Sequence, residues 1–146
     1  RRRILHCGCL DSRKEGIRQA FDRLPKGAAG NIESLHIESH GEFENGYREG
    51  ARIMASGADA VLFDTDRMAA GFLKYAAEER IDVPDRIAVV GFDDDIVARM
   101  SVPSLSTVAH PVSEINSTIL EIIERNPEEI VRRIFPTRFV PRDSSR

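Results

Sequence analysis

Short apolar runs alternate with longer helical patterns along most of this chain, and this alternation restricts the possible folds strongly. Residues 58–63 are apolar apart from Asp59, which is typical of a strand buried on both faces of a parallel sheet. Residues 66–80 follow, with apolar side chains at helical spacing. Strand and helix repeated in this order predict an α/β fold: a doubly wound, mostly parallel sheet with helices on both faces.

The same patterns predict the other elements. We expect further strands at residues 3–7, 32–37, 86–91, 105–108 and 133–140, and further helices at 12–24, 42–56 and 112–125, with a short helical turn after Asp95. Ser12 is the expected N-cap of the first helix, and Pro25 ends that helix. Tyr47, Ala51 and Met54 are expected on the inward face of the second helix.

Composition excludes several classes of protein. With 41% hydrophobic and 31% charged residues, the chain resembles a globular domain and not a disordered one. No apolar run approaches the roughly 18 residues of a membrane span. A net charge of −3 gives no electrostatic footprint for nucleic acid on this chain. The start lacks the pattern of a signal peptide, and Cys7 and Cys9 are expected to be free thiols, so we expect a cytoplasmic protein.

The residues give little support to the hypothesis that the chain is an enzyme. The turn at residues 8–11 lacks both G-x-G-x-x-G and the lysine of a P-loop. Asp64 is placed like the phosphoacceptor of a phosphorelay receiver, but the acidic pair and the lysine of such a site are missing. Ser12 and His110 lack a nucleophile-elbow sequence around them, and the histidines show no metal-ligand spacing. We therefore expect no enzyme, no cofactor and no metal.

Polar side chains instead collect where the expected strands end. Ligands of open α/β sheets bind in the crevice at the carboxyl ends of the strands. The residues expected there are 9–13, 38–43, 64–66, 92–95 and 109–110. They include an arginine, carboxylates, a histidine and an aromatic ring, which suit the binding of polyols or polar heterocycles.

Four segments, in order and at matching spacing, carry a family pattern. They are DAVLFDTDRMAAG at 59–71, RIAVVGFDD at 86–94, PSLSTVAHP at 103–111, and FPT at 135–137 with RDS at 142–144. Together they resemble the LacI/GalR family of transcriptional regulators, and residues 12–16 and 44–47 fit the family more loosely. The resemblance covers nearly the whole chain.

The resemblance implies one subdomain of a periplasmic-binding-protein-like (type I) effector-binding domain, spanning residues 1–146. It places a helix-turn-helix and a first subdomain outside this chain, and operator DNA is expected to bind through that helix-turn-helix. The expected effector is a sugar, a nucleoside or a similar small polar molecule. A homodimer is expected, with helices 42–56 and 66–80 as interface elements. The alternative is a sugar-binding protein of a transport system with the same fold.

The resemblance also assigns roles to single residues. Arg13 matches the arginine that the family presents to the effector, and a guanidinium suits vicinal hydroxyls or a carboxylate. Asp93 matches the family carboxylate that accepts hydrogen bonds from the ligand. Asp66, at a helix start, is instead expected to bind free backbone amides.

Departures from the family pattern bear on the effector. Thr65 stands where the family usually has asparagine. His110 stands where glutamine is common, and it would make binding pH-sensitive if it faces the crevice. His40 and Phe43 lie near the position at which many relatives place an aromatic ring for sugar stacking.

Overall fold

A six-stranded sheet organises the computed structural model, which describes residues 3–23, 31–37, 42–125 and 130–146. Its strand order is β2-β1-β3-β4-β5-β6; the first five are parallel and β6 is antiparallel to β5. The strands are β1 (Arg3–Gly8), β2 (Asn31–His36), β3 (Ala60–Phe63), β4 (Ala88–Asp93), β5 (Ser106–Ala109) and β6 (Arg138–Val140). The predicted α/β architecture is confirmed.

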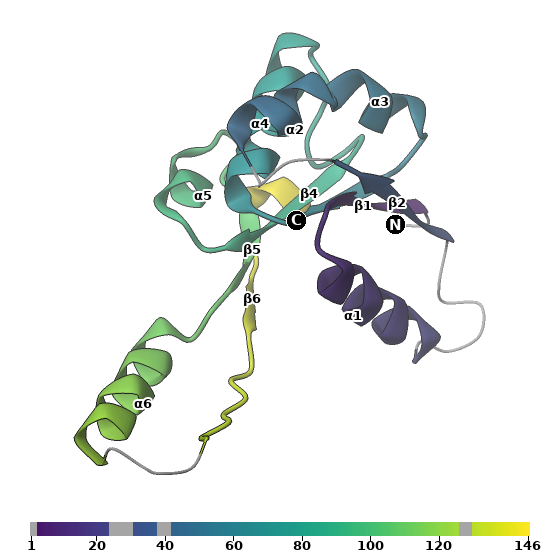
Figure 1. Ribbon diagram of the computed structural model, residues 1–146. Helices are drawn as coiled ribbons and strands as arrows, with labels where there is room; N and C mark the ends of the chain where they lie inside the picture. The colour runs from purple at the N-terminus through teal and green to yellow at the C-terminus, as the bar shows by residue number, and fades with distance from the viewer. Residues whose placement is uncertain (1–2, 24–30, 38–41, 126–129) are drawn as a thin grey trace.

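Helices lie on both sides of the sheet. They are α1 (Asp11–Asp22), α2 (Phe43–Arg48), α3 (Gly50–Ala55), α4 (Asp66–Glu78), α5 (Ile96–Met100) and α6 (Val112–Arg125), with a 3-10 turn η1 (Asp143–Ser145). Figure 1 shows α2, α3 and α4 over one face and α1 beneath the other. Among the helices in the described part of the chain, none is long and apolar enough to cross a membrane.

The core lies between the sheet and the helices α3 and α4. Alternate strand residues such as Cys7, Val61 and Val89 are fully buried there, and they pack with Ile53 and Phe72 from the helices. This alternation is the period of two that a strand imposes on its side chains. The opposite face of the sheet is less completely covered, because α1 has no fully buried residue.

The packing of α2 against α4 explains one wrong prediction. The helix predicted for residues 42–56 is two helices, interrupted at Glu49. Tyr47 and Ala51, predicted to face inward, are exposed, and the buried positions are Asn45, Gly46, Gly50 and Ile53. A β-carbon on Gly46 would lie 1.8 Å from the Met68 carbonyl oxygen. The contact face therefore consists of backbone at glycines, which hydrophobic spacing does not detect.

Two smaller predictions about element ends are also wrong. Helix α1 begins at Asp11 with Leu10 in the N-cap position, so Ser12 is not the cap. Strand β6 includes only residues 138–140, whereas a strand was predicted for residues 133–140. A strand needs a hydrogen-bonded neighbour, and the pairing between β5 and β6 stops at Ala109 and Arg138.

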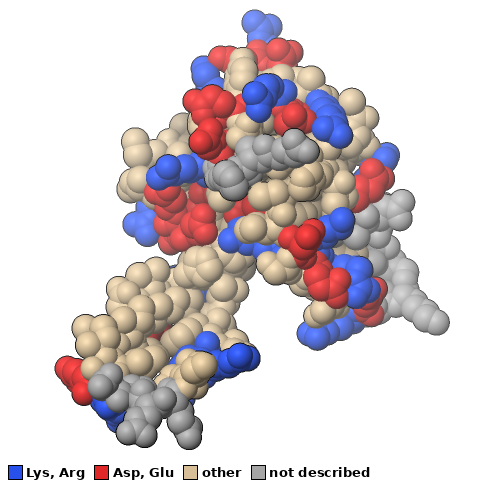
Figure 2. Space-filling model, in the orientation of Figure 1, with Lys and Arg blue, Asp and Glu red and all other residues tan. Residues whose placement is uncertain are grey.

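Helix α6 and residues 130–137 project away from the sheet, and together we call them the arm (Figure 1). None of the α6 residues is buried. The apolar side chains of the arm are open to solvent, with Ile123 67%, Ile130 89% and Ile134 98% exposed. In Figure 2 this lobe is largely uncharged. An apolar surface of this kind marks a site of interaction.

Candidate functional site

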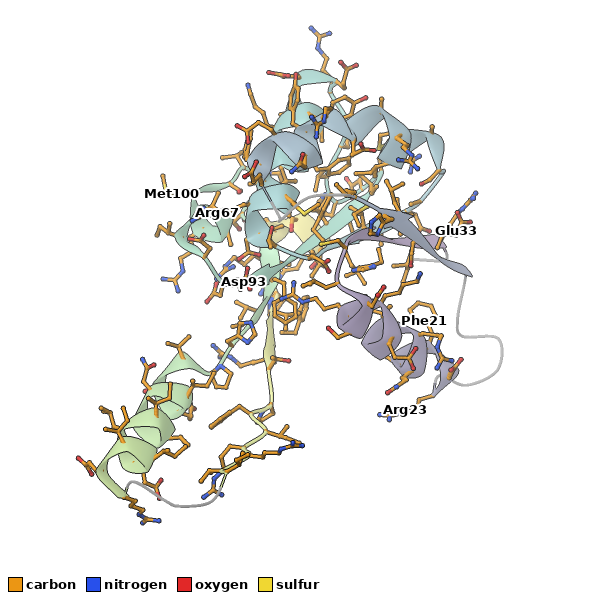
Figure 3. All side chains as sticks on the ribbon, in the orientation of Figure 1. Phe21, Arg23, Glu33, Arg67, Asp93 and Met100 are labelled. Carbon is orange, nitrogen blue, oxygen red and sulfur yellow. The ribbon has the colours of Figure 1, made fainter. Side chains whose placement is uncertain are left out.

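Arg13, Asp93 and His110 come together at the carboxyl edge of the sheet, as predicted. Arg13 lies in the first turn of α1, Asp93 ends β4, and His110 follows β5 directly. Asp93 Oδ1 lies 3.9 Å from Arg13 Nη2 and 3.6 Å from His110 Nε2. Figure 3 shows Asp93 where the sheet meets the arm. Burial raises the pKa of the Asp93 carboxyl, although the charges of Arg13 and His110 partly oppose this shift.

Phe92 belongs to the predicted range 92–95 at the strand ends, although no role of its own was predicted for it. The Arg13 guanidinium carbon lies 3.7 Å from the centre of the Phe92 ring, which is a cation–π contact. The His110 ring meets the same ring at 5.0 Å in an edge-on arrangement. Phe92 thus holds both basic side chains next to Asp93. Its place at the end of an expected strand, beside Asp93 in the GFDD segment, was the signal for it.

A hollow of about 480 Å³ adjoins these residues. Its lining includes Arg13, Asp64, Phe92 and Thr137 together with apolar side chains such as Leu62 and Val108. In Figure 2 a notch separates the lobe of the arm from the lobe of α1. A volume of a few hundred cubic ångströms, lined mostly by apolar atoms with a few polar groups, is typical of small-molecule sites.

Asp64 ties the start of α1 to the end of β3. Its carboxylate lies 2.9 Å from His6 Nε2 and accepts a 2.9 Å hydrogen bond from the Leu10 amide. Arg13 Nη1 donates to the Asp64 carbonyl oxygen. A β-carbon on Gly8 would lie 1.9 Å from Asp64 Oδ2, so only glycine leaves room for this carboxylate.

The environment of Asp64 favours its ionised form. Burial opposes ionisation, but the hydrogen bonds from His6 and Leu10 outweigh it and lower the pKa of the carboxyl. The side chain is 4% exposed, and its oxygens are occupied by groups of the protein itself. Asp64 is therefore a positioning residue for Arg13, and its burial does not suit an exposed phosphoacceptor.

The turn that presents Asp93 has an unusual backbone. Asp93 and Asp94 have φ angles of 112° and 57°, a region that residues other than glycine rarely adopt. The Asp95 amide donates to Asp66 Oδ2 at 2.8 Å, and Arg142 Nη2 donates to Asp94 Oδ1 at 2.5 Å. Strained backbone of this kind persists only where its surroundings hold it, and it is concentrated at functional sites.

Asp66 is the buried support beneath this turn. Its side chain is fully buried, and its second oxygen accepts a 2.6 Å hydrogen bond from Thr107 Oγ1. Burial raises its pKa to about 6, and the nearby charges of Asp93 and Asp94 add to the shift. Asp66 binds a backbone amide, as predicted, but that amide belongs to the loop of Asp95 and not to the start of α4. At the start of α4 it is Thr65 Oγ1 that accepts from the Met68 amide.

Arg142 and Ser144 fasten the last described segment to the sheet. Arg142 Nη1 donates to the Leu105 carbonyl oxygen at 2.7 Å. The fully buried Ser144 Oγ donates to the Val89 carbonyl oxygen at 2.6 Å and accepts from the Ser106 amide at 2.8 Å. The closing RDS segment therefore joins β4, β5 and the strained turn.

The other predicted site residues differ in their surroundings. Thr65 follows β3 at the same edge of the sheet and is the N-cap of α4. Phe43 does not reach the crevice: it lines a separate hollow of about 350 Å³ with Leu73, Met100 and Val102. His40 lies outside the described residues. Within the described ranges, no group of three or more His, Cys, Asp or Glu side chains could hold a metal ion.

Comparison with known proteins places this chain in a family. The family model of the periplasmic binding protein-like domain matches residues 1–145. The chain belongs to that family. Within the periplasmic binding protein-like family, its curated relatives include the HTH-type transcriptional regulator DegA of Bacillus subtilis, 32% identical over 107 residues that cover 73% of this chain and 31% of DegA. The chain thus spans about a third of the length of that relative.

Solved structures agree with this assignment. The Escherichia coli transcriptional repressor ascG is 25% identical with a TM-score of 0.76, over 98% of this chain and 55% of that one. A LacI family regulator from Arthrobacter, solved in complex with lactose, is 23% identical with a TM-score of 0.79, over 100% of this chain and 57% of that one. The resemblance to LacI/GalR regulators is confirmed, and these relatives are transcriptional regulators and not enzymes.

Proposed function

We propose that this chain forms one wall of the effector-binding cleft of a LacI/GalR-type transcriptional regulator. The observation that carries the proposal is the convergence of Arg13, Phe92, Asp93 and His110 beside a hollow of about 480 Å³. These groups offer hydrogen-bond donors, acceptors and an aromatic face, which together suit a small polar effector such as a sugar or a nucleoside. In this proposal the regulator is cytoplasmic and has no enzymatic activity.

The remainder of the cleft would come from another part of the protein. The arm exposes Ile123, Ile130 and Ile134, and burial of such side chains would be worth roughly 1.5–3 kcal/mol each. In our proposal the arm packs into a first subdomain, which lies across the cleft from the sheet. A helix-turn-helix beyond that subdomain would bind operator DNA, as the regulator relatives suggest.

The signal would pass as a shift between two arrangements of the subdomains. An effector that contacts Asp93 and His110 also touches the start of the arm, because His110 leads from β5 into α6. Only a difference in effector affinity between the two arrangements can change the DNA-binding state. The relatives favour this regulator over a transport protein, since they are named as regulators of transcription.

A second copy of the chain is the proposed occupant of the hollow at α4 and α5. Met100 and Val102 are 73% and 84% exposed there, beside the exposed Phe43. Figure 3 shows Met100 at the outer margin of the molecule. This surface includes parts of both helices predicted to form a homodimer. Analytical ultracentrifugation of the Val102→Glu variant should give a monomer where the unmodified protein gives a dimer.

A thermal-shift screen of the full-length protein tests the function. The library should contain sugars, sugar phosphates, nucleosides and bases. A ligand at a hundred times its Kd should stabilise the protein by about 2.7 kcal/mol. Arg13→Ala and Asp93→Ala should abolish the shift, and the exposed control Asp82→Asn should retain it. An unchanged shift in both site variants would remove this crevice as the effector site.

A further inference from the structure

Provided that the proposed function holds, the charged groups at the crevice restrict the chemical class of the effector. The Asp93 side chain is 40% exposed, and its closest basic nitrogens, on His110 and Arg13, lie at 3.6 Å and 3.9 Å. Both distances exceed that of a direct hydrogen bond. The carboxylate oxygens are thus available to a ligand. The strained turn, with its support from Asp66 and Arg142, keeps this carboxylate at the crevice.

Arg13 does not offer a free positive charge to that ligand. Its Nη1 donates to the Asp64 carbonyl oxygen, and its guanidinium stacks on Phe92. Two carboxylates flank it, with Asp64 Oδ1 and Asp93 Oδ1 each 3.9 Å from a guanidinium nitrogen. One cation between two carboxylates leaves a formal excess of one negative charge on this wall. A phosphate or carboxylate ligand would meet like charge here.

The neighbouring charges do not reverse this balance. Asp94 is paired with Arg142 at 2.5 Å and with Arg99 at 3.5 Å, and Asp95 is paired with Arg67 at 3.1 Å. The buried Asp66, which accepts from the Asp95 amide, is a third carboxylate at the turn. These three arginines and three carboxylates add no formal net charge. The one exposed carboxylate of the turn without a cation at hydrogen-bond distance, among the described contacts, is Asp93.

We propose that the effector carries a protonated amine, as an amino sugar does, and that its ammonium group binds Asp93. The ammonium donates up to three hydrogen bonds and supplies the positive charge that this wall lacks. Its ring hydroxyls would face the hollow beside Phe92 and Thr137. Anionic sugars, which carry a phosphate or a carboxylate, are rejected by the same residues.

Titration calorimetry on the full-length protein at pH 7.5 tests the proposal with matched ligands. One series is glucose, glucosamine, N-acetylglucosamine and glucose 6-phosphate. The second series is galactose, galactosamine, N-acetylgalactosamine and galactose 6-phosphate. In at least one series the amine should bind about ten- to a hundredfold more tightly than its parent sugar, the range expected for a hydrogen bond between charged groups. The N-acetyl compound keeps the nitrogen but loses the charge, so it should lose that advantage.

Variants test whether Asp93 causes the preference for the amine over the parent sugar. Asp93→Asn keeps the shape of the side chain and removes its charge, so the affinity for the amine should fall to that for the parent sugar. Asp82→Asn, at an exposed position before the start of β4, should leave the preference unchanged. Equal affinities for amine and parent, or tighter binding of the phosphate, overturn the amine proposal and leave the sensor function standing. Failure of every ligand in both series to bind overturns the amino-sugar proposal alone, because the thermal-shift screen of the wider library tests the sensor function separately.

Discussion

Replacement of Asp66 by asparagine should stabilise the folded chain at neutral pH, although it alters a fully buried residue. Burial raises the Asp66 pKa from 3.8 to about 6, and a shift of this size corresponds to roughly 3 kcal/mol. Asparagine can make a bond to each partner, because its carbonyl oxygen can accept from the Asp95 amide and its amide can donate to Thr107 Oγ1, which reverses the direction of that second bond. It loses the attraction of a carboxylate to the N-terminus of α4, about 0.5–1 kcal/mol. The net gain at pH 7.5 is therefore about 2 kcal/mol.

The pH dependence gives this prediction its sign. Below about pH 4, folded and unfolded chains both hold the proton, and the wild-type protein pays no penalty. As the pH rises from about 4 to about 6, the unfolded chain releases the proton first, and the folded state loses stability. Above the folded pKa of about 6 the penalty is complete. The advantage of Asp66→Asn should thus be small at pH 4.5 and full at pH 7.5.

Urea unfolding followed by circular dichroism at pH 4.5, 6.0 and 7.5 measures this difference. The midpoint of thermal unfolding at pH 7.5 should rise by about 4–8 °C. Asp82→Asn, at an exposed aspartate, is the matched control and should show neither effect. The reasoning fails if Asp66→Asn destabilises the chain at pH 7.5, or if its effect is the same at all three pH values.

Three further substitutions test other buried contacts. Thr107→Val removes a donor from the buried carboxylate at the start of α4, so it should cost about 2–3 kcal/mol at pH 7.5 and less at pH 4.5, as measured by urea unfolding. Ser144→Ala leaves an amide of β5 and a carbonyl of β4 without their partner. It should cost about 1–3 kcal/mol and speed hydrogen exchange of that amide; unchanged exchange would contradict the assignment. Gly8→Ala pushes against the Asp64 carboxylate and should lower stability by about 1–3 kcal/mol, whereas Gly16→Ala, with open space around it, should not lower the thermal midpoint.

The sheet was predictable because its strands are encoded locally. Residues 58–63 and 86–91 are nearly continuous apolar runs, and both lie in central strands that α3 and α4 cover on one face. The helix predicted at 66–80 is α4 with nearly the same bounds. Where the buried face consists of glycine backbone, as at Gly46, the same reasoning chose Tyr47 and failed.

The site was predictable only in part. The positions of Arg13, Asp93 and His110 follow from the rule that ligands bind at the carboxyl ends of parallel strands. The positive φ angles at Asp93 and Asp94 could not be predicted, because no glycine marks that turn. The burial of Asp66 depends on Thr107, 41 residues away in the sequence, and local patterns carry no information about such contacts.

The connection between the sheet and the arm has a mechanical consequence. The arm is joined to the sheet by an antiparallel ribbon of two strands, whose last pair is Ala109 and Arg138. The paired strands hold the chain as far as Ala109 and Arg138, so we expect any tilt of the arm to turn about an axis through that pair. His110 lies one residue beyond the axis and 3.6 Å from Asp93. We therefore expect a tilt of the arm to change the distance between these two side chains, and with it the width of the crevice.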